Sequence, residues 1–353
     1  IADVVNAQCG DSLPVSAFVP YMDGTMPNGT AAYEKRGVAV NVPVWDPATC
    51  IQCNNCVFVC PHAAIRSFIL TDEEAAAAPA GLKYADGKAT LKGYKFAIST
   101  SVADCTGCGN CVDVCLSKEK SIKMASYQDN IAEQANFDWL NAKVGYKKLF
   151  DPKSNMKNAQ FAQPLFEFSG ACAGCGETPY IKNITQLFGD HMMIANATGC
   201  SSIYGASFPS SPYCTNEKGH GPAWQNSLFE DFCEFGLGMR LGSERMRDTV
   251  ASLMQKGLQC ECCSDEMKAL FQQWLDNRSS YAVTREVTDK LVPLMEACGC
   301  DTCKSILALK QFLPARSQWI IGGDGASYDI GYGGLDHVLA SGENVNILVL
   351  DTE

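Results

Sequence analysis

The sequence predicts a cysteine-rich α+β unit followed by an α/β domain with a mostly parallel sheet. Two observations support this fold class. One cysteine pattern occurs twice in the first third of the chain, and each copy precedes an apolar stretch. Near the other end, apolar runs at 318–321 and 345–350 flank a helical pattern at 328–341. A strand, a helix and a second strand in this order favour a βαβ unit and therefore parallel strands.

The repeated pattern is Cys-x2-Cys-x2-Cys-x3-Cys, the thiolate spacing with which bacterial two-cluster ferredoxins hold two [4Fe–4S] clusters. In that arrangement three cysteines of one motif bind one cluster, and the fourth binds the partner cluster. We therefore predict a group A and a group B of ligands that exchange their fourth member. Group A is Cys50, Cys53, Cys56 and Cys115. Group B is Cys105, Cys108, Cys111 and Cys60.

Composition excludes several classes of protein. The formal net charge is −11 over 353 residues, which argues against nucleic-acid binding. No run of 18 apolar residues predicts a membrane span, and no signal peptide opens the chain. These features, together with the cluster spacing, predict a reducing cytoplasm, and oxygen-labile clusters favour an anaerobic or microaerobic host. Because the chain begins at Ile1 rather than Met and stops directly after a strand pattern, we expect a segment of a longer polypeptide.

Changes in composition and in apolar periodicity divide the chain into four predicted parts. These are an extended, turn-rich lead-in (1–45), the two-cluster unit (46–126), a crossover (127–165) and the α/β domain (166–353). Within the two-cluster unit we expect a helical insertion at Asp72–Ala78 and a hairpin at Gly81–Ile98 with an Asp86-Gly87 turn. Apolar periodicity over 242–312 predicts amphipathic helices that cover the sheet.

The predicted βαβ unit carries Gly323-Asp324-Gly325 at the carboxyl end of its first strand. Ligands of open α/β sheets bind beyond such strand ends, and glycine lets the backbone approach a diphosphate closely. Asp324 is a hard oxygen ligand suited to Mg²⁺. Thr352 follows the neighbouring strand, so both side chains could meet one cation. A tight turn capped by the aspartate is the alternative explanation of the motif.

Several stretches together resemble the pyruvate:ferredoxin oxidoreductase family. Gly323-Asp324-Gly325, Asp329 and Gly334 look like its thiamine-diphosphate signature. The other similar stretches are Leu13–Ser16, Gly29-Thr30 with Glu34–Gly37, Cys60–Ala63 with Ile65-Arg66, and Gly219–Trp224. The resemblance covers essentially the whole chain, in the order ferredoxin domain and then thiamine domain.

The resemblance implies further site residues. Cys172, Cys175 and Cys200 look like three ligands of the family's proximal [4Fe–4S] cluster, although zinc or a redox pair fits such spacing equally well. No residue is assigned as the fourth ligand. The positions implied at thiamine diphosphate are Glu177, Cys200, Gly323, Asp324, Gly325, Ala326 and Thr352, with Asp324 and Thr352 on Mg²⁺. The catalytic acid–base and substrate-binding residues are unknown and are expected outside the segment.

The function implied is oxidative decarboxylation of pyruvate to acetyl-CoA and CO2. Electrons would pass from thiamine diphosphate through three [4Fe–4S] clusters to ferredoxin or flavodoxin, in an enzyme that is expected to be a homodimer. Two alternatives remain open. One is the same chemistry on another 2-oxoacid, and the other is a non-catalytic iron–sulfur electron-transfer subunit whose Gly-Asp-Gly is only a turn.

The sequence leaves the roles of His62, Arg66 and the remaining cysteines undecided. His62 is expected to begin a helix rather than bind metal, and Arg66 could screen a cluster or form a surface ion pair. Six further cysteines admit a zinc site, a fourth cluster, disulfides or free thiols: Cys260, Cys262, Cys263, Cys298, Cys300 and Cys303. The remaining three, Cys9, Cys214 and Cys233, are expected to be small buried side chains.

Overall fold

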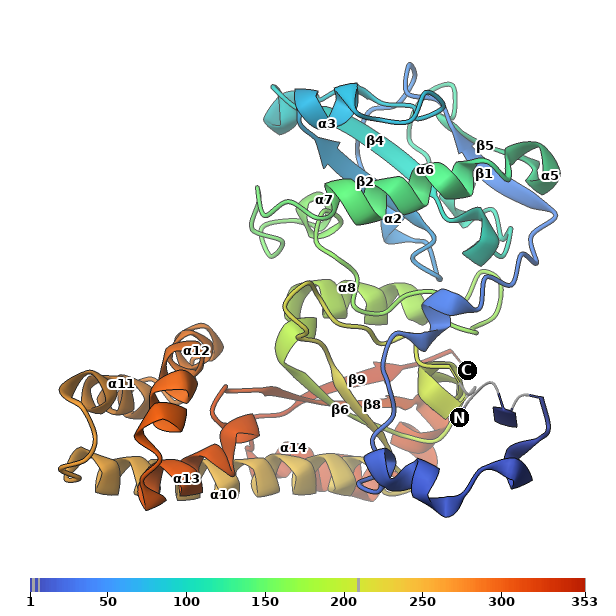
Figure 1. The fold of residues 1–353 in the computed structure, drawn as a ribbon. Helices are drawn as coiled ribbons and strands as arrows, with labels where there is room; N and C mark the ends of the chain where they lie inside the picture. Colours follow the sequence, from blue (N-terminus) through green and yellow to red (C-terminus); the bar gives the residue numbers. More distant parts are fainter. Residues whose placement is uncertain (2–3, 6, 208–209, 353) are drawn as a thin grey trace.

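The computed structural model describes residues 1, 4–5, 7–207 and 210–352. These residues form three neighbouring parts (Figure 1): the cysteine-rich unit at one end, a parallel sheet with its helices in the middle, and a group of helices that projects sideways. The lead-in contains short 3-10 helices at Gly10–Ser12, Val15–Tyr21 and Thr30–Tyr33. It packs on the middle part, where the Gly29 N–H donates to the Tyr213 carbonyl (2.6 Å).

The cysteine-rich unit is built on two antiparallel sheets. Strand β1 (Asn41–Trp45) pairs with β5 (Ile122–Ser126), so the unit begins about five residues before the predicted boundary at 46. The second sheet has the order β2-β4-β3, with β2 at Ile65–Leu70, β3 at Ala85–Asp86 and β4 at Lys95–Thr100. Each cysteine motif runs into a short helix, α2 (Asn55–Phe58) or α4 (Asn110–Asp113), and these two helices contact each other.

The predicted insertion and hairpin are both present. Helix α3 (Asp72–Ala76) starts with a capping box, in which Thr71 accepts from the Glu74 N–H and Glu74 accepts from the Thr71 N–H. Strands β3 and β4 pair antiparallel, but residues 87–94 between them include a 3-10 helix (Ala89–Leu91), so the connection is longer than a two-residue turn.

The predicted crossover is largely helical. It contains α5 (Tyr127–Asn130), α6 (Glu133–Trp139), the π-helix η6 (Leu140–Val144) and α7 (Met156–Ala159). Helix α6 packs on β4, and the buried rings of Phe68 and Phe137 meet edge to face with centroids 6.1 Å apart. The crossover therefore shares a core with the cysteine-rich unit.

The middle part is the predicted α/β domain. Within the described residues its sheet has four parallel strands in the order β7-β6-β8-β9, at Ala223–Asn226, Met192–Asn196, Ser317–Gly323 and Asn346–Leu350. The predicted βαβ unit is β8, α14 (Tyr332–Ser341) and β9. Helix α8 (Thr178–Phe188) covers one face of the sheet, and α14 with the first half of α10 (Phe232–Leu258) covers the other (Figure 1). Successive side chains of a strand point to opposite faces of the sheet, which explains the two layers of helices. Ile321 of β8 belongs to the core under α8, and Ile320 belongs to the core under α10 and α14.

The prediction that all helices of 242–312 cover the sheet is wrong. Helices α11 (Asp265–Asp276), α12 (Tyr281–Cys298) and α13 (Asp301–Leu307) pack with the second half of α10 around a separate core. Trp274 and Phe271, both fully buried, lie at its centre. The apolar periodicity identified the helices correctly, but it cannot say which surface an apolar face meets.

None of the described helices is both long and apolar enough to cross a membrane.

Candidate functional site

The structure brings the two crossed groups of cysteines together. One cavity is lined by all four members of group B, Cys60, Cys105, Cys108 and Cys111. A second cavity is lined by all four members of group A, Cys50, Cys53, Cys56 and Cys115. Each cavity therefore offers four thiols from two separate motifs, the donor set that a [4Fe–4S] cluster requires.

The local backbone prepares both groups in the same way. In each motif the first sulfur accepts a backbone hydrogen bond from the residue two positions on, Gln52 N to Cys50 Sγ and Gly107 N to Cys105 Sγ, both 3.3 Å long. The residue before each short helix has a left-handed backbone, with φ of 66° at Asn54 and 86° at Gly109. N–H groups aimed at sulfur stabilise a thiolate and help to set a cluster's potential.

Burial dominates the electrostatics of three of these thiols. It raises the pKa of Cys105 to about 12 and also raises the pKa values of Cys56 and Cys111. At Cys115 burial acts in the same direction, but hydrogen bonds with Ser117 outweigh it and the pKa is lowered. Cys56, Cys105 and Cys111 would therefore keep their protons at neutral pH unless a metal replaced them.

The two cavities are electrostatic neighbours. After burial, the largest influence that raises the pKa of Cys56 in group A is Cys111 of group B. In turn, the pKa of Cys111 is raised by its own group members Cys60, Cys105 and Cys108. Because α2 and α4 pack together, the exchanged fourth cysteines join both groups in one unit.

The third set of predicted ligands, here called the proximal group, is Cys172, Cys175 and Cys200. Burial, then Glu177 and then the other two cysteines raise the pKa of Cys200, so these side chains share one environment. The structure also joins this group to group B, because a Cβ on Gly174 would lie 3.6 Å from the Cβ of Cys108. Glu177 is buried, and its carboxylate accepts a 2.7 Å hydrogen bond from the Tyr204 hydroxyl.

Three predicted site residues follow the carboxyl ends of adjacent parallel strands. Cys200 comes after β6, Asp324 after β8 and Thr352 after β9. Gly323 and Leu350 are paired across β8 and β9, so Asp324 and Thr352 leave the sheet at neighbouring positions. This edge is where open α/β sheets bind ligands.

The strand ends are locally unusual. The chain enters π-helices at Ile203–Ser207 after β6 and at Gly325–Ile330 after β8, and single π turns are frequent at functional sites. A Cβ on Gly323 would meet no atom closer than 3.9 Å, whereas one on Gly325 would press on the Phe229 ring at 3.2 Å. An open backbone next to a carboxylate and a hydroxyl fits a diphosphate and a hard cation.

A polar network beside this edge was not foreseen in sequence. Fully buried Asn196 accepts from Trp224 Nε1 (3.2 Å) and donates to Ser201 Oγ (2.8 Å), which fixes the turn that presents Cys200. Thr198 donates to the Ser227 carbonyl (2.8 Å), which ties the ends of β6 and β7 together. Polar residues at the ends of successive strands could have indicated this network in the sequence. The sequence, however, did not lead us to predict strands β6 and β7.

Lys182 is a further residue that sequence reasoning missed. It lies on α8, is fully buried, and donates to the carbonyls of Val57 (2.5 Å) and Phe58 (3.0 Å) and to Gln160 Oε1 (3.0 Å). Burial lowers the pKa of this amine to about 7, while Cys60 and Cys56 act in the opposite direction. Lys182 thus links the α/β domain to the end of α2, between two cysteines of different groups.

His62 differs from the expectation, and so does the ion-pair alternative for Arg66. His62 lies in a turn rather than at a helix start, lines the group B cavity, and its Nδ1 is 3.0 Å from the Ser169 carbonyl. Arg66 forms a buried rather than a surface ion pair, with Glu167, and it donates to the Tyr146 hydroxyl (2.6 Å).

Cys214 and Cys233 are buried as expected, but Cys9 is exposed.

The fold and these cysteine groups define an iron–sulfur protein of the two-cluster ferredoxin type, joined to a parallel α/β domain. Residues 42–131 match the family described as a 4Fe-4S dicluster domain, and residues 1–39 match a domain of unknown function called EKR. The predicted two-cluster iron–sulfur domain is thereby confirmed.

Relatives identify the enzymes concerned. The chain is 54% identical over its whole length to a pyruvate-flavodoxin oxidoreductase of Klebsiella pneumoniae, and it covers 30% of that protein. It is 52% identical over 99% of its length to a pyruvate:ferredoxin oxidoreductase of Moorella thermoacetica, again covering 30%. A mitochondrial pyruvate dehydrogenase [NADP(+)] of Euglena gracilis is 45% identical over 98% of the chain, which covers 19% of that protein. The chain is therefore homologous, from end to end, to one segment of the pyruvate:ferredoxin (flavodoxin) oxidoreductases, as its motifs predicted.

Proposed function

We propose that the chain is the electron-transfer and thiamine-binding part of an enzyme that oxidises pyruvate to acetyl-CoA and CO2. In this proposal the thiols of groups A and B and of the proximal group hold three [4Fe–4S] clusters, which carry electrons from thiamine diphosphate to ferredoxin or flavodoxin. The names of the relatives support the substrate and the acceptors. When bound, thiamine diphosphate would supply a nucleophilic carbanion centre and an electron sink for the 2-oxoacid.

One observation carries the proposal: the three cysteine groups lie in unbroken succession. The proximal group begins at the carboxyl edge of the sheet with Cys200 and meets group B where Gly174 lies against Cys108. Group B in turn influences group A through Cys111 and Cys56. This order supports the proposal of a single electron-transfer route from the sheet edge to the outer end of the cysteine-rich unit.

At the sheet edge, the proposed roles follow from the donor chemistry. Asp324 and Thr352 would hold Mg²⁺, because a carboxylate and a hydroxyl on neighbouring strand ends are hard oxygen donors. The backbone from Gly323 through Ala326 would lie along the diphosphate, since it has no side chain on its open side at Gly323. Glu177, oriented by Tyr204 and close to Cys200, would position the cofactor at the proximal group.

At the opposite end, the surface beside group A is suited to a protein acceptor. Ile51 lies between the first two cysteines of its motif and is 49% exposed, and Leu116 directly follows Cys115 and is 67% exposed. Exposed apolar side chains beside a redox group give a small, transient contact of the kind that electron-transfer partners use. We assign this surface to ferredoxin or flavodoxin.

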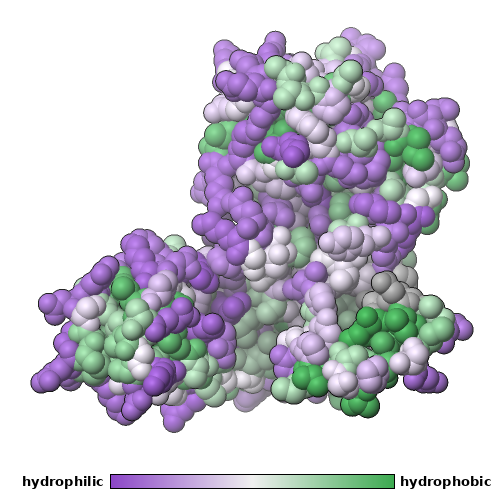
Figure 2. Space-filling view, in the orientation of Figure 1, coloured by the Kyte–Doolittle hydropathy of each residue, from purple (hydrophilic) through white to green (hydrophobic). Residues whose placement is uncertain are grey.

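Coenzyme A as acyl acceptor, a homodimeric assembly and a cytoplasmic location belong to the same proposal. The lead-in supports an interface with another chain or domain, because several of its apolar side chains are exposed (Figure 2). They are Val15, Phe18, Val19, Tyr21, Met22 and Met26. An apolar surface of this kind is typical of contact sites.

The test uses the full-length protein under anaerobic conditions with Mg²⁺ and thiamine diphosphate. We expect CoA-dependent reduction of a viologen dye by pyruvate, and little reduction by 2-oxoglutarate, branched 2-oxoacids or indolepyruvate. No reduction by any of these acids, in protein with intact clusters and bound thiamine, would overturn the proposal. The variant Asp324→Asn is expected to lose bound thiamine while keeping its iron, and Asp336→Asn, at an exposed position of α14, is the matched control.

A further inference from the structure

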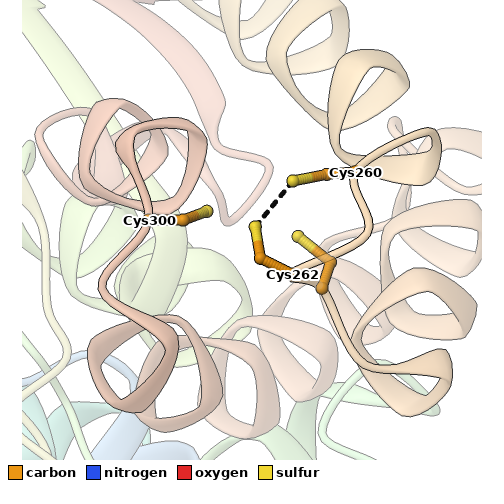
Figure 3. Close-up of side chains that lie close together, drawn as sticks. Cys260, Cys262 and Cys300 are labelled. Atoms are coloured by element: carbon orange, nitrogen blue, oxygen red, sulfur yellow. Dashed lines mark hydrogen bonds between the residues drawn. The ribbon is translucent and has the colours of Figure 1, made fainter.

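The projecting helical unit contains six cysteines that the proposed electron-transfer route does not use. Three lie in the turn between α10 and α11 (Cys260, Cys262 and Cys263), and three lie where α12 passes into α13 (Cys298, Cys300 and Cys303). The two turns are adjacent in space. Figure 3 shows Cys260 and Cys262 on one side and Cys300 on the other, with their side chains pointing toward one another.

The six sulfur atoms form two overlapping sets of four. In the first set, Cys260, Cys262, Cys263 and Cys300, all sulfurs lie within 4.8 Å of one another. The same limit holds for the second set, Cys263, Cys298, Cys300 and Cys303. Both sets contain Cys263 and Cys300, one from each turn. Six thiols that divide into two tetrads with two shared members have the connectivity of two metal ions bridged by two thiolates.

We propose that this unit holds a binuclear zinc–thiolate site, in which Cys263 and Cys300 bridge two Zn²⁺ ions. Cys260 and Cys262 would complete the tetrahedron of one ion, and Cys298 and Cys303 that of the other. Zinc prefers four tetrahedral ligands in structural sites and binds thiolates at about 2.3 Å. Two thiolates on one such ion lie roughly 3.8 Å apart, well inside the observed limit of 4.8 Å.

The spacing separates this site from an iron–sulfur cluster. In a [4Fe–4S] cluster each thiolate binds a different iron, so the four thiolates lie farther apart than they do around a single ion. The chain itself supplies the comparison. Groups A and B line their cavities, yet among the described residues no three ligand atoms of either group come within 4.8 Å of one another. The helical unit has the compact spacing, and tetrahedral sulfur at that spacing indicates zinc.

A disulfide is the main competing use of these thiols. The sulfurs of Cys260 and Cys262 are only 2.6 Å apart, but this exceeds the 2.03–2.05 Å of a sulfur–sulfur bond. Binding one zinc ion would separate this pair by about 1 Å, to the edge length of a tetrahedron. A disulfide there would remove two of the four thiols of the first tetrad and leave Cys263 and Cys300 with partners in the second tetrad alone.

The position of the site indicates a structural role. Cys263 and Cys303 are buried in the core formed by the second half of α10 with α11, α12 and α13. Cys260, Cys298 and Cys300 pack at its edge, and Cys262 is exposed. Metal bridges would tie the α10–α11 turn to the α12–α13 turn, 35 residues or more along the chain. A structural metal at the edge of this core would add the free energy of metal binding to that of folding.

The test is a metal count and an element-specific spectrum of the full-length protein purified without chelators. We expect about two zinc ions per chain in addition to the cluster iron. X-ray absorption at the zinc edge is expected to show sulfur at about 2.3 Å and a second zinc as a neighbour. One zinc ion per chain, no zinc, or a Cys260–Cys262 disulfide found by mass spectrometry would each overturn the binuclear site. Since iron is counted separately, loss of the proposed pyruvate activity would not affect this result.

Two variants test the sharing of ligands. Cys262 is exposed and belongs to one tetrad only, so Cys262→Ser is expected to lower zinc from about two ions to about one. Cys263 belongs to both tetrads, so Cys263→Ser is expected to remove nearly all zinc. The exposed Cys9→Ser, outside the unit, is the control and keeps both ions. Equal zinc loss in Cys262→Ser and Cys263→Ser, in protein whose iron content is unchanged, would overturn the shared arrangement. If Cys263→Ser fails to fold, the stoichiometry of Cys262→Ser still decides.

Discussion

Lys182 gives the sharpest prediction, because its amine is buried where the α/β domain meets the cysteine-rich unit. Its pKa is lowered from 10.5 to about 7, chiefly by burial. In the unfolded chain the amine keeps its ordinary pKa. Between pH 7 and 10.5 the unfolded state therefore binds more protons than the folded state, and the stability of the protein rises with pH across this window.

The size of the effect follows from the two pKa values. At about 1.4 kcal/mol per pKa unit, the full difference is on the order of 5 kcal/mol. Between pH 6.5 and 8.5 the linkage relation gives roughly 2 kcal/mol, because protonation of the folded state is incomplete over part of that range. The variant Lys182→Met fills the same space without a titrating group. It therefore lacks the pH dependence that Lys182 gives to the free energy of unfolding.

We therefore expect the free energy of unfolding of the original protein to rise by roughly 2 kcal/mol relative to that of Lys182→Met from pH 6.5 to pH 8.5. For a domain of 150–250 residues this corresponds to about 4–8 °C in melting temperature. The measurement is thermal unfolding of the cluster-loaded protein under anaerobic conditions, followed by circular dichroism at both pH values.

The variant Lys290→Met is the matched control, since Lys290 lies on the surface of α12 with its side chain 58% exposed. Its stability gap is expected to be the same at both pH values. A pH-independent gap for Lys182→Met would refute the reasoning. That result would mean that the three acceptors and the nearby Cys56 and Cys60 keep the amine charged in spite of its burial.

Three further predictions concern the proposed electron-transfer route and the packing around it. Cys60→Ala is expected to disrupt the cluster of the second motif and to spare the cluster of the first motif. Iron content and electron paramagnetic resonance measure this, and loss of the first cluster alone would contradict the crossed ligation. Gly174→Ala forces a left-handed backbone on alanine (φ 76°), at about 1–2 kcal/mol, beside group B, and is expected to slow dye reduction. Gly219→Ala has the same strain (φ 74°) in open space, so an equal slowing there would contradict the relay order. Arg66→Met leaves the Glu167 carboxylate unpaired and is expected to lower stability by about 3–5 kcal/mol, measured by denaturant unfolding; a change under 1 kcal/mol would show that the pair is not buried in solution.

Local spacing decided much of what the sequence could predict. The two Cys-x2-Cys-x2-Cys-x3-Cys runs specify a tight loop and a short helix each, so the two-cluster unit followed from the sequence alone. The capping box at Thr71 and the βαβ pattern around Gly323 are also local, because their signals lie within one or two turns or strands. The family resemblance added Cys172, Cys175 and Cys200, which no local pattern joins.

Contacts between distant segments were decided only by the tertiary structure. Helical periodicity placed 265–307 on the sheet, whereas these helices pack against the far half of α10, because an apolar face does not specify its partner. The same limit hid Lys182, whose acceptors at Val57 and Phe58 are 124 residues or more away in sequence. It also left the six cysteines of 260–303 undecided: their number was visible in the sequence, but two tetrads that share Cys263 and Cys300 exist only once two helical turns meet.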